Sequence, residues 1–210
     1  MRRFYKYNLW AKMLCIGERV KKGTFKPCIT TIPCSTISEA LNANLNREDI
    51  FALGFLNDDY LLEIDKKRQI MTTAPKDTIL LVAKLPLTTE YLIDVKAEIF
   101  IEERDGLKEI LKDYPSFQMG ALKSKGLGNC EVSFDRTLSE NETEIIEGRL
   151  RTRIYKDKET FERLGIEDVI KPLYGYLYKR TSPIRGYYQL SLFEGSILRG
   201  PRFIMEEVKK

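Results

Sequence analysis

The segment 117–135 reads FQMGALKSKGLGNCEVSFD, and its central part, GALKSKGLG (120–128), is the most distinctive stretch of the chain. Glycine allows positive φ angles and leaves backbone N–H groups uncovered, while lysine adds positive charge. This composition predicts a loop that lies against phosphate and stays outside the hydrophobic core. The alternative is a solvated connection with no ligand. The predicted contact residues are Gly120, Lys123, Ser124, Lys125, Gly126 and Gly128.

The flanking patterns exclude two familiar phosphate-binding loops. A helix-like pattern precedes the glycine segment, and Cys130, Val132 and Phe134 alternate with polar residues after it, as in a strand. A Walker loop and a dinucleotide-binding loop both leave a strand and enter a helix, which is the opposite order. The glycine segment is therefore neither of them.

Further strands are predicted upstream of the loop. Residues 3–15 alternate between apolar and polar side chains, which is typical of a half-buried strand. The apolar run 78–85 has the length of a buried strand, and the segment 95–101 alternates strictly. These three segments and the strand after the loop make four predicted strands.

Helices are predicted from their capping residues. The predicted caps are Thr36 with Glu39, Asn46 with Asp49, and Asp105 alone. Gly54 ends the second of these helices and Pro115 halts the third. The resulting order is strand, helix, strand, strand, helix, strand, with the short second helix as an addition.

This order predicts an α+β fold of the ferredoxin-like βαββαβ type, which RNA-recognition-motif domains share. We expect this domain to span residues 1–136, with the glycine loop between its second main helix and its fourth strand. Residues 137–210 are expected to form a reduced second αβ half, with a soft boundary between the two because no low-complexity linker separates them.

The second half carries two further chemical patterns. Arg149, Arg151 and Arg153 alternate with Leu150, Thr152 and Ile154 and predict an arginine edge on a strand. Side chains on one strand face recur every ~6.6–6.8 Å, so the arginines could follow a nucleic-acid backbone. The alternative is a surface strand whose arginines pair with acids such as Glu144 or Glu147.

Three tyrosines alternate along a later strand. Tyr174, Tyr176 and Tyr178 lie on one face of that predicted strand. Aromatic residues favour strands for packing reasons alone, so we expect packing here in preference to base stacking. Asp157 is expected to cap a short helix before them.

Composition narrows the class of function. The chain of 210 residues contains no histidine, which removes the commonest general base and the commonest metal ligand. Formal net charge is +4, so an RNA surface must come from local patterning. The four cysteines form no CxxC pair and are expected to be reduced core thiols. We expect no cofactor and no metal, because the adjacent acids Asp58-Asp59 and Glu102-Glu103 lack ligand spacing.

Two motifs resemble those of a known superfamily. GALKSKGLGNCEV (120–132) is similar to the glycine-rich loop of the RAMP superfamily, the repeat-associated proteins of CRISPR effector complexes. TIPCSTISEAL (31–41) resembles the segment of that superfamily that opens the first helix, with Cys34 in place of the usual glycine or serine. The pair Ser38-Glu39 and the segment FEGSILRG (193–200) are closer to the type III members that cap the 5′ end of the guide RNA.

The resemblance implies a function that composition alone does not. It implies a non-catalytic subunit of a type III CRISPR complex that is cytoplasmic, has no membrane contact and holds the repeat-derived 5′ handle of the guide RNA. Ser35 and Thr36 would offer N–H groups of the helix start to a phosphate. The implied partners are the guide RNA, the large signature subunit and the backbone RAMP subunits. The alternatives are a histidine-free endoribonuclease that processes guide precursors and a backbone-forming RAMP subunit.

Overall fold

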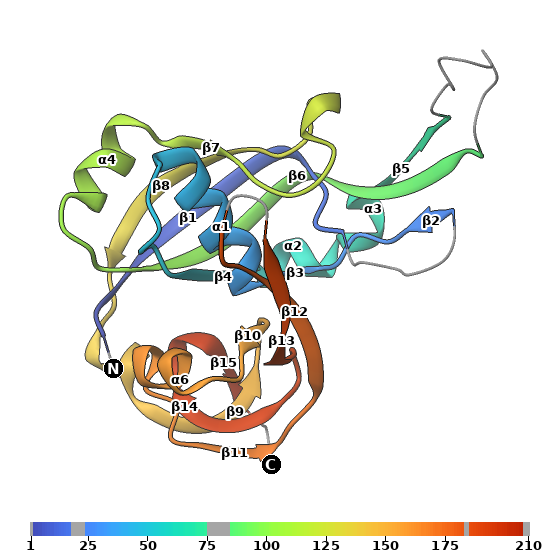
Figure 1. Cartoon of the computed structure of the whole chain (residues 1–210). Helices are drawn as coiled ribbons and strands as arrows, with labels where there is room; N and C mark the ends of the chain where they lie inside the picture. Colours follow the sequence, from blue (N-terminus) through green and yellow to red (C-terminus); the bar gives the residue numbers. More distant parts are fainter. Residues whose placement is uncertain (1, 18–23, 75–84, 183–184, 208–210) are drawn as a thin grey trace.

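The computed structural model describes residues 2–17, 24–74, 85–182 and 185–207, and Figure 1 shows two halves packed against each other. The strands of the first half are β1 (Phe4–Leu14), β2 (Phe25–Lys26), β3 (Thr31–Ile32), β4 (Ala52–Leu56), β5 (Arg68–Thr73), β6 (Leu87–Glu102), β7 (Ser116–Gln118) and β8 (Asn129–Thr137). Its helices are α1 (Cys34–Leu45), α2 (Asp58–Leu62), α3 (Ile64–Lys67), α4 (Leu107–Asp113) and the 3-10 turn η1 (Lys123–Lys125).

The second half consists mainly of strands. These are β9 (Ile145–Leu150), β10 (Ile154–Tyr155), β11 (Asp168–Lys171), β12 (Tyr174–Arg180), β13 (Gly186–Leu192), β14 (Ile197–Pro201) and β15 (Met205–Glu207). Its helices are α5 (Glu140–Thr143), α6 (Lys158–Leu164) and the 3-10 turn η2 (Arg202–Ile204). The strands form one sheet in the order β11-β14-β9-β15 and another in the order β10-β13-β12.

The first half has the predicted βαββαβ topology. Its elements follow one another as β1, α1, β4, β6, α4 and β8, and the central strands lie in the order β4-β6-β1-β8, all antiparallel to their neighbours. Helices α1 and α4 pack on one face of this sheet, where Ile37 and Leu107 join Leu9 and Ile99 in one core. The predicted α+β ferredoxin-like fold is confirmed.

A second core lies on the opposite face of the same sheet. Phe4, Leu53 and Phe100 from the first half pack there with Leu150 and Phe203 from the second half. The second half therefore covers the sheet face that α1 and α4 leave open. Because both halves contribute to this core, their relative position is held by packing as well as by the chain connection.

Buried charge also joins the two halves. The carboxylate of Glu102, at the end of β6, is 1% exposed and contacts three arginines. Arg163 of α6 donates to Glu102 at 2.5 Å, while Arg2 and Arg104 approach the same carboxylate at 2.7 and 3.1 Å. A buried carboxylate requires such partners, so this cluster fixes α6 against the end of the sheet.

Several predicted boundaries differ from the structure. The predicted capping box of Thr36 is wrong, because α1 begins at Cys34 after Pro33 and no side chain caps it. The predicted cap at Asp105 is also wrong, since Gly106 with φ of 70° precedes α4. The predicted Asp157 cap of α6 is confirmed, because its carboxylate accepts the N–H of Thr160 at 2.7 Å.

The short helix predicted after Asn46 is wrong. Asn46 instead ends α1 in the left-handed conformation, with φ of 52°, and the following apolar residues form β4. Gly54 lies inside this strand, where an added Cβ would come within 2.8 Å of the Glu98 carbonyl oxygen. The strand predicted over 78–85 falls almost entirely outside the described residues.

Candidate nucleic-acid interface

The glycine loop connects β7 to β8 and adopts the backbone that its glycines predict. Gly120, Gly126 and Gly128 have φ angles of 86°, 85° and 85°, a region that favours glycine. Lys123, Ser124 and Lys125 form the η1 turn between these glycines, and all three are exposed. The loop therefore presents two cations and a hydroxyl to solvent.

The three glycines differ in how closely other atoms surround them. A Cβ on Gly120 would lie 2.4 Å from the Cys15 carbonyl oxygen, and one on Gly128 would lie 2.1 Å from that of Met119. A Cβ on Gly126 would meet nothing within 4 Å. Leu127 between them is fully buried. The expectation that the whole loop lies outside the core is therefore wrong for Leu127 and Gly128.

Some backbone N–H groups of the loop donate hydrogen bonds within the protein, and others do not. The N–H of Ala121 donates to Cys15 O at 2.7 Å, and that of Gly128 donates to Met13 O at 2.8 Å. Lys125 N–H closes the turn onto Leu122 O at 2.8 Å. Within the described ranges, no acceptor is found for the N–H groups of Lys123 and Ser124. These two amides, together with the lysine side chains, are the groups that can meet an anion.

The loop and the start of α1 line one hollow. We call it the loop hollow; its volume is about 370 Å³. Its lining residues are Ile16 and Gly17, Thr36, Glu39, Ala40 and Ala43 of α1, Gly120, Ala121 and Lys123 of the loop, and Arg180 of β12. Thr36 and Lys123 come from the two motifs, far apart in sequence, that carry the RAMP resemblance. The fold brings these motifs together.

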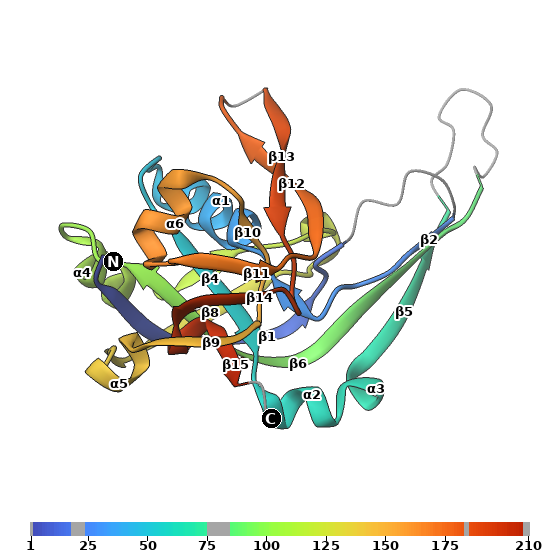
Figure 2. The same ribbon diagram turned by 90° about the horizontal axis from the view of Figure 1, so that it is seen from below.

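A larger groove continues from the loop hollow along the β12–β13 hairpin. We call it the hairpin groove; its volume is about 1180 Å³, and it shares Ile16, Gly17 and Thr36 with the loop hollow. Ser35 lines this groove beside Tyr176. In Figure 2 the hairpin projects from the body next to α1. The two spaces thus lie next to each other.

Two backbone N–H groups at the start of α1 already have acceptors within the protein. The N–H of Cys34 donates to Arg153 O at 2.9 Å, and that of Thr36 donates to Pro33 O at 2.9 Å. The expectation that Thr36 offers its N–H group to a phosphate is therefore wrong. Ser35 is mostly buried, at 9% exposure, so Thr36 is the motif residue that reaches both spaces.

Sequence reasoning missed two charged residues in the loop hollow. Glu39 and Arg180 both line it, from α1 and from the end of β12. Burial raises the pKa of Glu39, and the positive charge of Arg180 opposes that rise. The position of Arg180 at the end of the tyrosine strand was the available signal, but only the folded hairpin places it beside the loop.

The three arginines of the predicted edge do not share one exposed face. The predicted strand through them is wrong, since β9 ends at Leu150 and β10 begins at Ile154. Arg149 is exposed, but Arg151 binds Asp58 and stacks on Phe55, with its guanidinium 3.8 Å from the ring centroid.

Arg153 is the most deeply placed of the three. It is 8% exposed and forms two hydrogen bonds to Glu194, from Nε at 2.7 Å and from Nη2 at 2.8 Å. Its guanidinium lies 4.1 Å from the Phe193 ring centroid. The neighbouring Thr152 hydroxyl donates to Ile32 O at 2.9 Å. Arg151 and Arg153 therefore belong to the junction between the halves.

The tyrosines of β12 are exposed. Tyr174, Tyr176 and Tyr178 have exposed fractions of 53%, 64% and 43%. Core packing is therefore excluded for these tyrosines, whereas packing on the sheet face, the other form of the expected packing, is seen between Tyr178 and Tyr188, whose ring centroids are 5.7 Å apart. Tyr176 and Tyr178 also line the hairpin groove.

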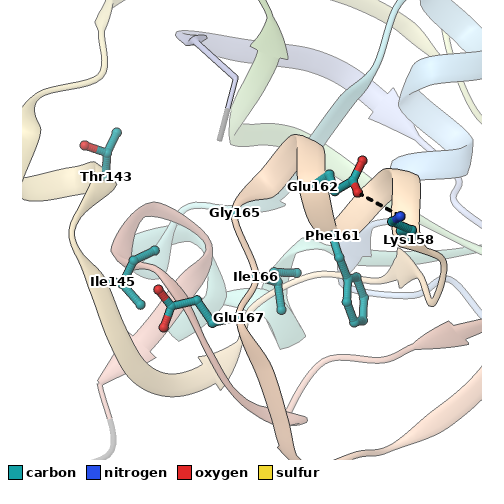
Figure 3. A pocket seen from close by; sticks show the side chains of 8 residues that line it. All are labelled: Thr143, Ile145, Lys158, Phe161, Glu162, Gly165, Ile166 and Glu167. Atoms are coloured by element: carbon teal, nitrogen blue, oxygen red, sulfur yellow. Dashed lines mark ion pairs between the residues drawn. The ribbon is translucent and has the colours of Figure 1, made fainter.

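A separate hollow in the second half has a different character. Figure 3 shows Lys158 and Glu162 of α6 paired at 3.6 Å above it, with Ile145, Phe161 and Ile166 around it. It contains none of the predicted RNA-contact residues. The paired charges and apolar lining do not favour phosphate.

The residues in the described part of the chain also bear on metal binding and on membrane insertion. Those residues contain no group of three or more Cys, Asp or Glu side chains placed to hold a metal ion. The four cysteines are buried and free of disulfides. Of the helices in the described ranges, none has the length and apolar character needed to cross a membrane.

The sequence matches no protein-family model and no curated protein. Chains of solved structures share the fold, and two of them come from Type III-B Cmr-beta. A chain of the Type III-B Cmr-beta bound to cognate target RNA and AMPPnP has a TM-score of 0.59 at 11% identity, covering 92% of this chain and 86% of that chain. A chain of the Type III-B Cmr-beta bound to cognate target RNA has a TM-score of 0.55 at 10% identity, with the same coverage. At these identities the likeness shows the fold alone, and this fold agrees with the one that the RAMP resemblance implies.

Proposed function

We propose that this chain is an RNA-binding subunit of a type III CRISPR effector complex, which holds the 5′ handle of the guide RNA without cleaving it. The carrying observation is the loop hollow, where the two RAMP-like motifs meet. The likeness to chains of Type III-B Cmr-beta structures, which are bound to target RNA, supports the same assignment. The assignment to the handle rests on the motif resemblance to type III caps.

Binding would be electrostatic and geometric. The exposed ammonium groups of Lys123 and Lys125 and the open N–H groups of Lys123 and Ser124 would contact phosphates. Arg180 would add a third cation across the hollow. Neighbouring subunits, including the large signature subunit and the backbone subunits, would complete the channel. Such contacts position a backbone and do not read its sequence.

The first test removes charge from the loop. The variant Lys123→Ala/Lys125→Ala should weaken RNA binding across sequences and reduce the slope of log K against log salt by about 1 to 2 units, because one or two phosphate contacts are lost. Filter binding at several salt concentrations measures this slope.

A matched variant controls for net charge. Lys66→Ala/Lys158→Ala removes two lysines that are 80% and 90% exposed and lie outside both the loop hollow and the hairpin groove. It should leave the slope nearly unchanged. An equal change in both variants would mean that the loop has no particular role in binding.

Two further measurements separate the alternatives. Labelled repeat RNA incubated with the purified chain in the absence of metal should remain intact, and specific cleavage would establish the ribonuclease alternative. Purification of the native complex should give one copy of this chain per guide RNA. Several copies along one guide would identify a backbone subunit.

A further inference from the structure

The β12–β13 hairpin gathers four tyrosines on one face. Residues directly opposite each other in an antiparallel pair share a face, and Tyr178 lies opposite Tyr188. Tyr174 and Tyr176 follow on the same face at intervals of two residues. We call Tyr174, Tyr176, Tyr178 and Tyr188 the tyrosine face. Tyr188 is 46% exposed, so each of the four rings is about half exposed or more. A cluster of this kind marks a binding surface.

The tyrosine face lies along the path proposed for the RNA backbone. Tyr176, Tyr178 and Tyr188 line the hairpin groove, and that groove meets the loop hollow at Thr36. A chain held by its phosphates at Lys123 would therefore extend its next nucleotides toward these rings.

The spacing of the rings suits bases. Side chains two residues apart on a strand are ~6.8 Å apart, about twice the ~3.4 Å rise of stacked nucleotides. This spacing matches the room that one base needs between the side chains of Tyr176 and Tyr178. The rings of Tyr178 and Tyr188 already meet edge to face, with centroids 5.7 Å apart. This contact fixes the orientation of both rings before a ligand arrives.

The charges around the tyrosine face favour a phosphate-bearing ligand. Lys156 donates to the Tyr174 hydroxyl at 2.9 Å, and Arg180 and Arg185 are exposed at the far end of the hairpin. The nearby acids are already paired: Asp157 with Lys179 at 3.4 Å and Glu194 with Arg153 at 2.7 Å. A cationic edge beside aromatic rings is the pattern of surfaces that bind single-stranded nucleic acids.

We propose that the tyrosine face stacks the bases of single-stranded RNA whose backbone is held at the loop hollow. This inference rests on the proposed function and adds to it a preference for unpaired bases. Because every base has a π-face, the preference is tolerant of sequence. A base-paired strand could not insert its bases between the rings.

Paired variants test the stacking. In the full chain, Tyr176→Ala/Tyr178→Ala should weaken binding of a short mixed-sequence single-stranded RNA about 5- to 150-fold for each stacked base lost. Tyr176→Phe/Tyr178→Phe keeps the rings and should bind nearly as tightly as the natural chain. Tyr114→Ala removes a tyrosine that is 69% exposed at the end of α4 and should have no effect. A fluorescent adenine analogue in the RNA reports stacking directly through quenching.

Each outcome either supports or overturns the base-stacking inference. Loss of binding and of quenching in the alanine variant alone supports the inference. Full affinity in that variant, while the loop variant Lys123→Ala/Lys125→Ala loses affinity, overturns the inference and leaves the proposed function standing. Full affinity in both variants overturns both. Equal losses for single-stranded and double-stranded RNA, or loss of a partner protein with RNA binding intact, also overturn base stacking.

Discussion

The glycine loop and the segment 149–153 both carry evenly spaced cations, but their side chains end in different surroundings. In the part of the chain that the structure describes, Lys123 and Lys125 form no ion pair and are exposed, and Lys123 lines the loop hollow. Arg151 and Arg153 instead bind acids that come from other elements, Asp58 and Glu194. The lysines remain available to a ligand, whereas these arginines hold the molecule together.

The difference follows from where each segment lies in the fold. The loop joins two strands at the edge of the first sheet and faces outward between its glycines. Arg151 and Arg153 follow β9, where the chain passes between the two halves and the carbonyl oxygen of Arg153 accepts the N–H of Cys34 at the start of α1. A cation that is enclosed by packing needs a partner within the protein, because an unpaired buried charge is costly. Equal spacing of cations therefore does not indicate equal function.

The largest expected effect separates the glycines of the loop. Gly128→Val should lower the free energy of unfolding by about 3 to 5 kcal/mol, because the new side chain meets the Met119 carbonyl at a positive φ. Gly126→Val should cost about 1 to 3 kcal/mol, since only the φ angle opposes it. Denaturant melts followed by circular dichroism measure both values. Equal losses would show that the two glycines serve one purpose.

The next effect concerns the enclosed arginine. Arg153→Gln should lower the free energy of unfolding by about 2 to 3 kcal/mol, less than for a fully enclosed pair because the Glu194 side chain is 37% exposed. Arg153 also lines the hairpin groove, but its guanidinium is bound to Glu194, so the folded variant should keep most of its RNA affinity. Reduced RNA affinity in a variant of unchanged stability would show that Arg153 contacts RNA. Urea melts and filter binding on the same sample distinguish these results.

The order of the main elements could be predicted because β1, α1, β6, α4 and β8 bury one face and expose the other over much of their length. Their alternation follows the period of the element, so the sequence carries the pattern. Strand β4 is different: all five of its residues are buried, since Leu53 and Phe55 enter one core while Ala52 and Leu56 enter the other. A strand buried on both faces shows no alternation, and the local box at Asn46 then suggested a helix.

The candidate site was predictable only in part. The glycine loop carries its own conformational signal, because few other residues adopt φ near 85°. The burial of Arg153 and the exposure of Tyr176 depend on which distant element covers each residue. No spacing rule in a single segment contains that information. For the same reason the sequence did not predict that Arg180 and Lys123 line one hollow.

A smaller effect is expected from the acid in the loop hollow. Glu39→Gln should strengthen RNA binding by about 2- to 5-fold near neutral pH, because it removes a negative charge from the path of phosphates. Burial raises the pKa of Glu39, so the natural chain should gain affinity as pH falls and this carboxylate takes up a proton. The glutamine variant should lose that part of the pH dependence. Filter binding over a pH series compares the two chains.

The smallest effect should come from Arg149, the arginine that remains exposed. It lies on β9 opposite Glu206 of β15, in the sheet β11-β14-β9-β15, and lines neither the loop hollow nor the hairpin groove. Arg149→Gln should change the free energy of unfolding by no more than about 0.5 kcal/mol, as for most surface substitutions. RNA affinity and its salt dependence should also stay unchanged.

This near-absence of effect is informative because Arg149 and Lys125 carry the same charge at similar exposure. If position decides function, removal of the lysine weakens binding and removal of the arginine does not. A reduced salt slope in Arg149→Gln would show that RNA, or a second segment of it, crosses the sheet of the second half. The exposed arginine would then mark a contact that the loop hollow does not account for, and the contrast between loop and arginine segment would hold only for Arg151 and Arg153.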